Sequence, residues 1–374
     1  MRSFFSLIII SFIIYSLNCS FQASLFNKMN KDKKGENLII SPLSIFQALS
    51  LAANGAKGET QSEMLDVLQV DNITTLNQIN YKILAQFQEF STIDMANAVM
   101  TKFTPIEDFS NIAKKYSSPI EPLISAEQVN NWCSNKTKGK IDKIINKIDP
   151  NTLMIILNAV YFKGEWTTKF EMYSTKQLPF YNLGVEEVEV DTMKKIAYYG
   201  YYEDKKVQAV ELQFLYDNMS AIIILPSEGI DINKYVETLS LSSEEYNKII
   251  NGLEMVKVDV QLPKFELEFE GSLNEILYEL GMDKAFNQLE ADFTGLRKEG
   301  ELFVSEVMHK TYLKIFEYGC DAAAVTSIWI GGGGGPIDEK IYEMKINRPF
   351  LFLLRNRDLP IGLDLVFMSK IEKL

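Results

Sequence analysis

The sequence predicts a single α+β domain. Helical periodicity dominates the first half of the 374-residue chain, and apolar or alternating strand patterns dominate from Met154 onward. No Pro/Gly/Ser-rich linker divides the halves, and no repeat of roughly 20 to 50 residues runs through them. With 47% hydrophobic and 24% charged residues, the chain can bury a large core. A helical half that continues without a break into a strand-rich half favours one α+β domain.

The first twenty residues are typical of a secretory signal peptide. Arg2 precedes an apolar run from Phe4 to Leu17, and small or polar residues follow at 18–20. A transmembrane anchor is the alternative, but a span needs about 20 apolar residues, and this run is shorter. We therefore expect residues 1–20 to be removed and residues 21–374 to form a secreted, extracellular domain with no membrane contact.

The elements of the first half are mainly helices. Ser41-Pro42 is a helix start, and the helix continues through Ala53, before Gly55 and Gly58. Further helical patterns cover 60–68, 76–90, 106–115 and 126–147, and strand patterns cover 37–40 and 95–101.

The second half is mainly strands. Apolar or alternating patterns cover 154–162, 188–193, 197–203, 207–212, 221–225, 256–265, 304–316 and 350–354. Helical patterns interrupt them at 232–239, 242–250 and 272–280.

Charge and rare residue types exclude several functions. A net charge of -12 argues against nucleic-acid binding. The helix at 76–90 carries only Lys82, and acids intersperse the lysines of 138–147, so we expect no heparin-type activator. One histidine, His309, and three cysteines exclude His-rich metal sites and a disulfide scaffold, so no metal and no cofactor is expected. If Cys19 leaves with the signal peptide, Cys133 and Cys320 remain as free thiols.

The remaining motifs concern catalysis and glycosylation. His309 is the only histidine that could serve a Ser-His-Asp or Cys-His site, and no Gly-x-Ser-x-Gly elbow exists, so we do not expect an enzyme. Asn-x-Ser/Thr sequons at Asn72, Asn135 and Asn218 are candidate glycosylation sites in a secreted protein.

The segment CDAAAVTSIWIGGGGGPI, residues 320–337, has an anomalous composition. Asp321 is its only charge, and five consecutive glycines, 331–335, give the backbone maximal freedom. A flexible surface loop would account for the glycines. At period two, however, positions 320 to 330 present one uniformly small or apolar face. The segment therefore suits two environments, a loop and a strand.

Ordered motifs spread over residues 21–374 resemble the serpin family. They are NLIISPLSI at 37–45, GAKGET at 55–60, NAVYFKGEW at 158–166, LPKF at 262–265, LGMDKAF at 280–286, ADFTG at 291–295, VMHK at 307–310, EYGCDAAA at 317–324 and NRPF at 347–350. The resemblance implies a serpin fold of about nine helices and three β-sheets, with an exposed reactive-centre loop at about 317–346. It also implies a monomer.

The resemblance further implies a mechanism of inhibition. A target protease attacks the loop as a suicide substrate, forms a covalent acyl complex and is trapped when the cleaved loop inserts into the central sheet. The hinge that enters first comprises Glu317, Gly319, Cys320, Asp321, Ala322, Ala323, Ala324, Val325 and Thr326. Its small residues favour inhibition. A non-inhibitory binding or carrier protein on the same fold is the alternative.

The scissile bond follows from counting along the loop. Family spacing from the hinge glycine gives Gly333–Gly334, whereas counting back from Asn347 gives a position near Asp338. We favour the forward count, because the hinge side fixes insertion depth. A glycine before the cut favours an elastase-like or permissive serine protease, or a cysteine protease that reads Trp329 or Ile330. Lys340 would suit a trypsin-like target.

Two groups are implied at the central sheet. Ser41, Ser44, Asn158 and His309 match the family's shutter, a polar cluster that controls how the sheet parts. Trp166 matches the breach, where the loop enters, as does Glu317. Ordinary burial would also explain Trp166, and an ordinary surface acid would explain Glu317. Cys320 is a candidate redox handle, since oxidation would enlarge a side chain that insertion must bury.

Overall fold

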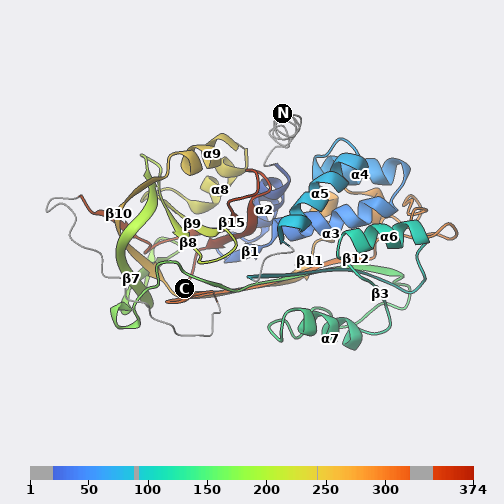
Figure 1. The fold of residues 1–374 in the computed structure, drawn as a ribbon, viewed down its shortest axis with the longest axis horizontal. Coiled ribbons are helices and arrows are strands. Elements are labelled where there is room, and N and C mark those ends of the chain that lie inside the picture. The colour runs from blue at the N-terminus through green and yellow to red at the C-terminus, as the bar shows by residue number, and fades with distance from the viewer. Residues whose placement is uncertain (1–19, 88–91, 242, 321–339) are drawn as a thin grey trace.

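The computed structural model describes residues 20–87, 92–241, 243–320 and 340–374. Within these ranges the chain forms nine α-helices and sixteen strands around two sheets (Figure 1). The helices are α2 (Ser20–Asp32), α3 (Pro42–Gly55), α4 (Gly58–Leu68), α5 (Ile73–Phe87), α6 (Glu107–Lys115), α7 (Ala126–Lys136), α8 (Ile232–Leu241), α9 (Ser243–Asn251) and α10 (Asn274–Glu279). The α+β class and the expected helix number are confirmed for the described residues.

One of the two sheets has seven strands in the described residues. Its order is β3-β2-β4-β12-β13-β5, and β11 pairs with β12 outside that path. Its strands are β2 (Ile93–Thr101), β3 (Ile120–Pro122), β4 (Met154–Phe162), β5 (Gly164–Glu165), β11 (Phe265–Ser272), β12 (Glu306–Phe316) and β13 (Gly319–Cys320).

The other nine strands form one sheet, in the order β1-β16-β15-β9-β8-β7-β10-β14, with β6 on β7. They are β1 (Leu38–Ile40), β6 (Lys176–Asn182), β7 (Glu186–Glu203), β8 (Val207–Gln213), β9 (Met219–Pro226), β10 (Glu254–Pro263), β14 (Tyr342–Lys345), β15 (Phe350–Asn356) and β16 (Leu365–Ile371). Among the described residues, hydrogen bonding thus joins the strands into two networks, where three sheets were expected. The reason is that β7, 18 residues long, pairs with β6, β10 and β8 and joins their strands into one network.

The seven-stranded sheet has a helix-covered layer on each face. In Figure 1, α3 to α6 lie above it and α7 lies below. Alternation along β4 follows these layers: Ile156 and Val160 join the large core with α3, whereas Ile155 and Leu157 join a smaller core with α7. Every residue of β4 is buried, as expected for a strand covered on both faces.

Several expected boundaries are wrong. The helix expected over 126–147 ends at Lys136, because Lys138 and Gly139 adopt positive φ and Thr137 Oγ1 accepts a hydrogen bond from the Ile141 amide. The strands expected at 188–193 and 197–203 are one strand, β7. The patterns gave no indication of β6, β14 or β16, or of β11 as a separate strand. No helix of the described residues is long and apolar enough to cross a membrane.

Candidate functional site

The parallel pairing of β4 and β12 forms a seam through the seven-stranded sheet. Seven residue pairs run along it, from Glu306 opposite Ile155 to Tyr312 opposite Tyr161. His309 lies opposite Asn158 in this register. Asn158 in turn lies opposite Asn97 of the next strand, β2. The pairing therefore brings three polar side chains into one row across the middle of the sheet.

The middle of the seam is held by the shutter cluster, Ser41, Ser44, Asn158 and His309. His309 Nε2 accepts a hydrogen bond from the Ser41 backbone amide at 3.1 Å, so the ring proton resides on Nδ1 and is donated to Asn158 Oδ1. Asn158 Nδ2 donates to Ser44 Oγ and to Asn97 Oδ1. The structure thus brings together all four residues expected for the shutter.

Two details of this cluster differ from a simple side-chain network. Ser41 contributes its backbone amide, and its own hydroxyl is buried without a partner among the described residues. Ser44 reaches His309 only through Asn158. The cluster therefore depends on Asn158, which forms hydrogen bonds with Ser44 of α3, Asn97 of β2 and His309 of β12.

Burial governs the ionisation of His309. The side chain is fully buried, and desolvation lowers its pKa to about 3. The imidazole is therefore neutral at physiological pH. A neutral ring can donate at one nitrogen and accept at the other, as the contacts with Asn158 and Ser41 require. Among the described residues, the partners of the ring are a backbone amide and a side-chain amide rather than a carboxylate.

One end of the seam lies where β4 ends and β5 begins, and we call it the upper end. At this end the two strands of the seam are already separated. Here β13 lies between β12 and β5: Cys320 pairs with Ile315 on one side and with Gly164 on the other. Both pairings are antiparallel. The offset between their two partners, from Gly164 to Ile315, is the same as that from Asn158 to His309 in the closed seam. A third strand therefore occupies this end without shifting β12 along β4 and β5.

Glycines make this close approach feasible. Gly319 has a φ of +139°, and a Cβ there would lie 1.9 Å from the Gly164 carbonyl oxygen. Gly164 is also crowded, with a Cβ position 2.7 Å from the Phe162 ring. A side chain at Gly319 would force β13 away from β5, whereas one at Gly164 would displace the Phe162 and Phe214 rings.

The breach lies directly beside β13. Trp166 is buried, stacks on Phe214 with ring centroids 4.2 Å apart, and donates from Nε1 to the Phe316 carbonyl oxygen at 3.1 Å. Its backbone amide donates to the Tyr318 carbonyl oxygen at 2.9 Å. The indole thus fixes the turn between β12 and β13 to the end of β5.

Glu317 is a buried anchor rather than a surface acid. It is 4% exposed, and its Oε1 accepts a hydrogen bond from Thr175 Oγ1 at 2.8 Å. Lys264 Nζ lies 3.3 Å from the same oxygen. The carboxylate is therefore paired and hydrogen-bonded, as a buried charge must be to be tolerated.

Three contacts of this site were missed by sequence reasoning. Asn97, Lys264 and Thr175 come from strands or loops distant in sequence from the residues they contact. Lys264 stands in the LPKF motif at 262–265, which was the one available signal. Nothing in the local pattern of Asn97 or Thr175 distinguishes them.

Other expected residues are placed as follows. Asn72, Asn135 and Asn218 are exposed, as glycan acceptors must be. Cys133 and Cys320 are buried, and burial raises the pKa of Cys133 to about 12. Asp321, Ala322, Ala323, Ala324, Val325 and Thr326 of the hinge, and Gly333 and Gly334, lie outside the described residues. In the part of the chain that the structure describes, no group of acidic, His and Cys side chains could hold a metal ion.

Comparison with known proteins gives concordant matches. A family model described as Serpin (serine protease inhibitor) matches residues 16–372. Iripin-5 of Ixodes ricinus is 33% identical over 366 residues, covering 91% of this chain and 89% of the relative. Leukocyte elastase inhibitor of Xenopus laevis is 32% identical over 356 residues, covering 89% of this chain and 92% of the relative.

Solved structures agree. The thermophilic serpin tengpin in its native state superposes with a TM-score of 0.86 at 32% identity, covering 96% of this chain and 93% of that chain. Thyroxine-binding globulin in complex with thyroxine has a TM-score of 0.83 at 24% identity, covering 96% and 99%. The second match concerns the fold alone.

Proposed function

The chain belongs to the serpin family, and on that premise we propose that it is a protease inhibitor that traps its target as a suicide substrate. In this proposal the protease cleaves a bond within the segment that follows Cys320 and becomes acylated. The cleaved segment then extends β13 down the seam between β4 and β12. The acylated protease is carried along before it can complete hydrolysis.

The single observation that supports this most is the position of β13. Its two residues already occupy the place of a strand between β12 and β5, in a register that continues that of the closed seam. Continuing the same pairing, residue 322 would face Leu313 and Phe162, and residue 324 would face Thr311 and Val160. Residue 326 would face His309 and Asn158.

The same continuation assigns the hinge residues to faces. Even-numbered positions would share the face of Ile315, Leu313 and His309, which are buried toward the α3 layer. These positions carry Cys320, Ala322, Ala324 and Thr326, which are small. The charged Asp321 would fall on the opposite face, beside the exposed Lys314. The small or apolar face of the segment therefore matches the buried side of the seam.

Energetics favour such a trap. An inserted strand replaces one interstrand interface with two and adds on the order of ten backbone hydrogen bonds, each contributing roughly 0.5 to 1.5 kcal/mol net. The intact fold would then be held kinetically rather than being the lowest state in free energy.

We propose Gly333–Gly334 as the scissile bond and an elastase-like or permissive serine protease as the target, with a cysteine protease second. A glycine before the cut offers no side chain to a deep specificity pocket. The name of the relative from Xenopus laevis, leukocyte elastase inhibitor, agrees with an elastase-like target.

The decisive experiment is incubation with a panel of serine and cysteine proteases, followed by SDS gel electrophoresis and mass spectrometry of the released fragment. An SDS-resistant complex with cleavage after Gly333 is expected, and the loop-cleaved protein should melt more than about 10 °C above the intact one. Cleavage without any complex, and no gain in melting temperature, would favour the non-inhibitory binding or carrier class.

We further propose that the protein is secreted as a monomer after loss of residues 1–20 and carries glycans at Asn72, Asn135 or Asn218. The apolar run at 4–17 and the exposure of the three asparagines support this. At Asn72 the side-chain Oδ1 accepts the Thr75 amide at 2.9 Å, which leaves Nδ2 for a glycan. Expression through a secretory host, N-terminal sequencing and a glycosidase gel shift test these points.

A further inference from the structure

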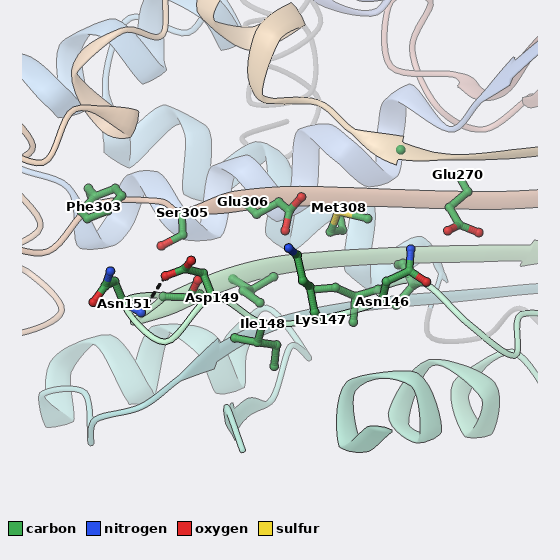
Figure 2. A pocket seen from close by; sticks show the side chains of 15 residues that line it. Asn146, Lys147, Ile148, Asp149, Asn151, Glu270, Phe303, Ser305, Glu306 and Met308 are labelled. Atoms are coloured by element: carbon green, nitrogen blue, oxygen red, sulfur yellow. Dashed lines mark hydrogen bonds between the residues drawn. The ribbon is translucent and has the colours of Figure 1, made fainter. Parts of the chain in front are cut away.

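A cavity of about 600 Å³ lies at the lower end of the seam, where β12 begins (Figure 2). It is lined by Ile155 of β4, by Glu306 and Met308 of β12, and by the connector 144–152 that leads from α7 to β4. Glu306 opposite Ile155 is the first residue pair of the seam. The cavity therefore touches both strands that insertion would separate, at the end opposite the breach.

Two charged side chains of opposite sign, Lys147 and Glu306, face this cavity. Figure 2 shows the exposed Lys147 and the Glu306 side chain pointing toward one another from the connector and from β12. Among the described residues, no hydrogen bond or ion pair engages either side chain. Glu306 is half-buried, and burial raises its pKa with no counter-charge opposing the shift. The Ser305 hydroxyl, also in the lining, is buried and unpartnered.

The rest of the lining is largely apolar near these groups. Ile144 and Met308 are buried, and Ile148 is half-buried beside them. An apolar wall with a few convergent polar groups is the usual composition of a small-molecule site.

We propose that this cavity binds a small zwitterion with an apolar side chain, such as an α-amino acid or a short peptide with free termini. Its ammonium group would bind Glu306, its carboxylate would bind Lys147, and its side chain would pack on the isoleucine wall. A simple anion would meet Glu306 and Asp149, which line the cavity; Glu270 also lines it but is paired with Lys310. A simple cation would leave Lys147 unpaired beside it. Only a ligand with both charges offsets both side chains.

The site would also regulate insertion, a consequence that rests on the proposed function. A ligand held by β12 through Glu306 and by the β4 connector through Lys147 binds only while the two strands are adjacent. It must therefore favour the closed seam by the ratio of its affinities for the closed and open forms. Bound ligand would slow loop insertion and let more protease escape.

The test uses the full mature chain and three probes with one carbon skeleton: L-leucine, leucinamide and 4-methylpentanoate, measured by isothermal titration calorimetry at pH 7. Leucine should bind at least tenfold more tightly than either analogue. E306Q should weaken leucine and leucinamide tenfold or more, and K147M should weaken leucine while leaving leucinamide unchanged. D66N, at an exposed site on α4, is the matched control and should change nothing. Equal binding of the three probes, or wild-type leucine affinity in E306Q, would overturn the proposal.

A second measurement separates this inference from the proposed function. Saturating leucine should slow formation of the SDS-resistant complex at least threefold in wild type and not in E306Q; an unchanged rate in wild type with leucine bound would overturn the regulatory part. Leucine binding without complex formation by any protease would remove the inhibitor proposal and leave the site. Complex formation without leucine binding would remove the site and leave the inhibitor proposal.

Discussion

The upper end and the middle of the same seam are built differently. At the upper end a third strand, β13, already separates β12 from β5, and Gly319 permits it, because a Cβ there would meet the Gly164 carbonyl oxygen. In the middle, β4 and β12 pair directly, and a polar network centred on Asn158 joins them to β2 and α3. In the proposed mechanism, strand insertion would therefore begin at the end that β13 already occupies and would have to separate the paired polar side chains in the middle.

The strongest test of this comparison asks whether the hinge continues down the seam in the register of β13. A324E would place a carboxylate between Thr311 and Val160, both fully buried. Burying an unpaired charge costs several kcal/mol, so we expect at least a hundredfold loss of inhibitory efficiency. A323E, on the opposite face, is the control and should lose less than tenfold. Equal losses would show that the register is not continued. Stoichiometry of inhibition against a cognate protease measures both.

Removing the centre of the shutter cluster should have the next largest effect. N158A leaves His309 Nδ1 without its partner and removes the hydrogen bonds from Asn158 to Ser44 and Asn97, although Ser44 Oγ still donates to Asn97. The unpaired buried group costs about 1 to 3 kcal/mol and each lost hydrogen bond about 0.5 to 1.5 kcal/mol, so the free energy of unfolding should fall by roughly 2 to 6 kcal/mol. Urea unfolding measures it, and N131A, at an exposed position on α7, should have almost no effect. A wild-type unfolding midpoint for N158A would contradict a seam held by this cluster.

The pH dependence of stability reports on the same cluster. The pKa of His309 is lowered to about 3 in the folded state, against about 6.5 when unfolded, so its contribution is complete above pH 6.5 and is lost as pH falls toward 3. Between pH 7.5 and 5.5 the loss should be about 1.4 kcal/mol. His309 is the only histidine, so H309Q should lack this component.

Buried carboxyl groups also contribute to the pH dependence of stability, and the comparison of wild type with H309Q must separate their contribution from that of His309. Burial raises the pKa of Glu306 and Asp364, so their contributions have the opposite sign and are lost as pH rises. The difference between wild type and H309Q removes them, because both proteins keep these groups. Parallel pH profiles of urea unfolding for the two proteins would contradict a neutral, buried His309.

The smallest effect is expected at the anchor of the upper end. T175V removes one hydrogen bond to Glu317, while Lys264 remains close to the same oxygen. We expect a loss of about 1 kcal/mol in the free energy of unfolding. T167V, at an exposed neighbouring threonine, should cost less. A loss larger than that of N158A would reverse the order of the two regions.

Sequence patterns predicted the fold better than its boundaries. The strand at 154–162 and the helix beginning at Pro42 were predicted closely, because each is a long, strongly apolar or well-signalled segment. The strand β14 was not predicted, since its partner β10 is distant in sequence and local periodicity does not reveal it. The strand β6 was also missed, although it forms a hairpin with β7. The end of α7 depended on the conformation of Lys138, which composition does not reveal.

The site residues that were predicted are those that lie within recognisable sequence motifs. Ser44, Asn158 and His309 were assigned together through the family resemblance, and the structure brings them into contact. The contact of Asn97 with Asn158 could not be predicted, because it exists only through the pairing of β2 with β4. The burial of Glu317 was likewise a tertiary effect, set by Thr175 and Lys264.

The shared offset of the seam and of β13 has a mechanical consequence. If a strand enters without any slip of β12 along β4, the sheet need only widen sideways, by one strand spacing of about 4.8 Å. The strands β2, β3 and β4 would then move together as one rigid body, and α7, which packs on β2, would move with them. A cross-link between α7 and β11 would prevent this movement, so the proposed reactive-centre loop could still be cleaved but could not insert.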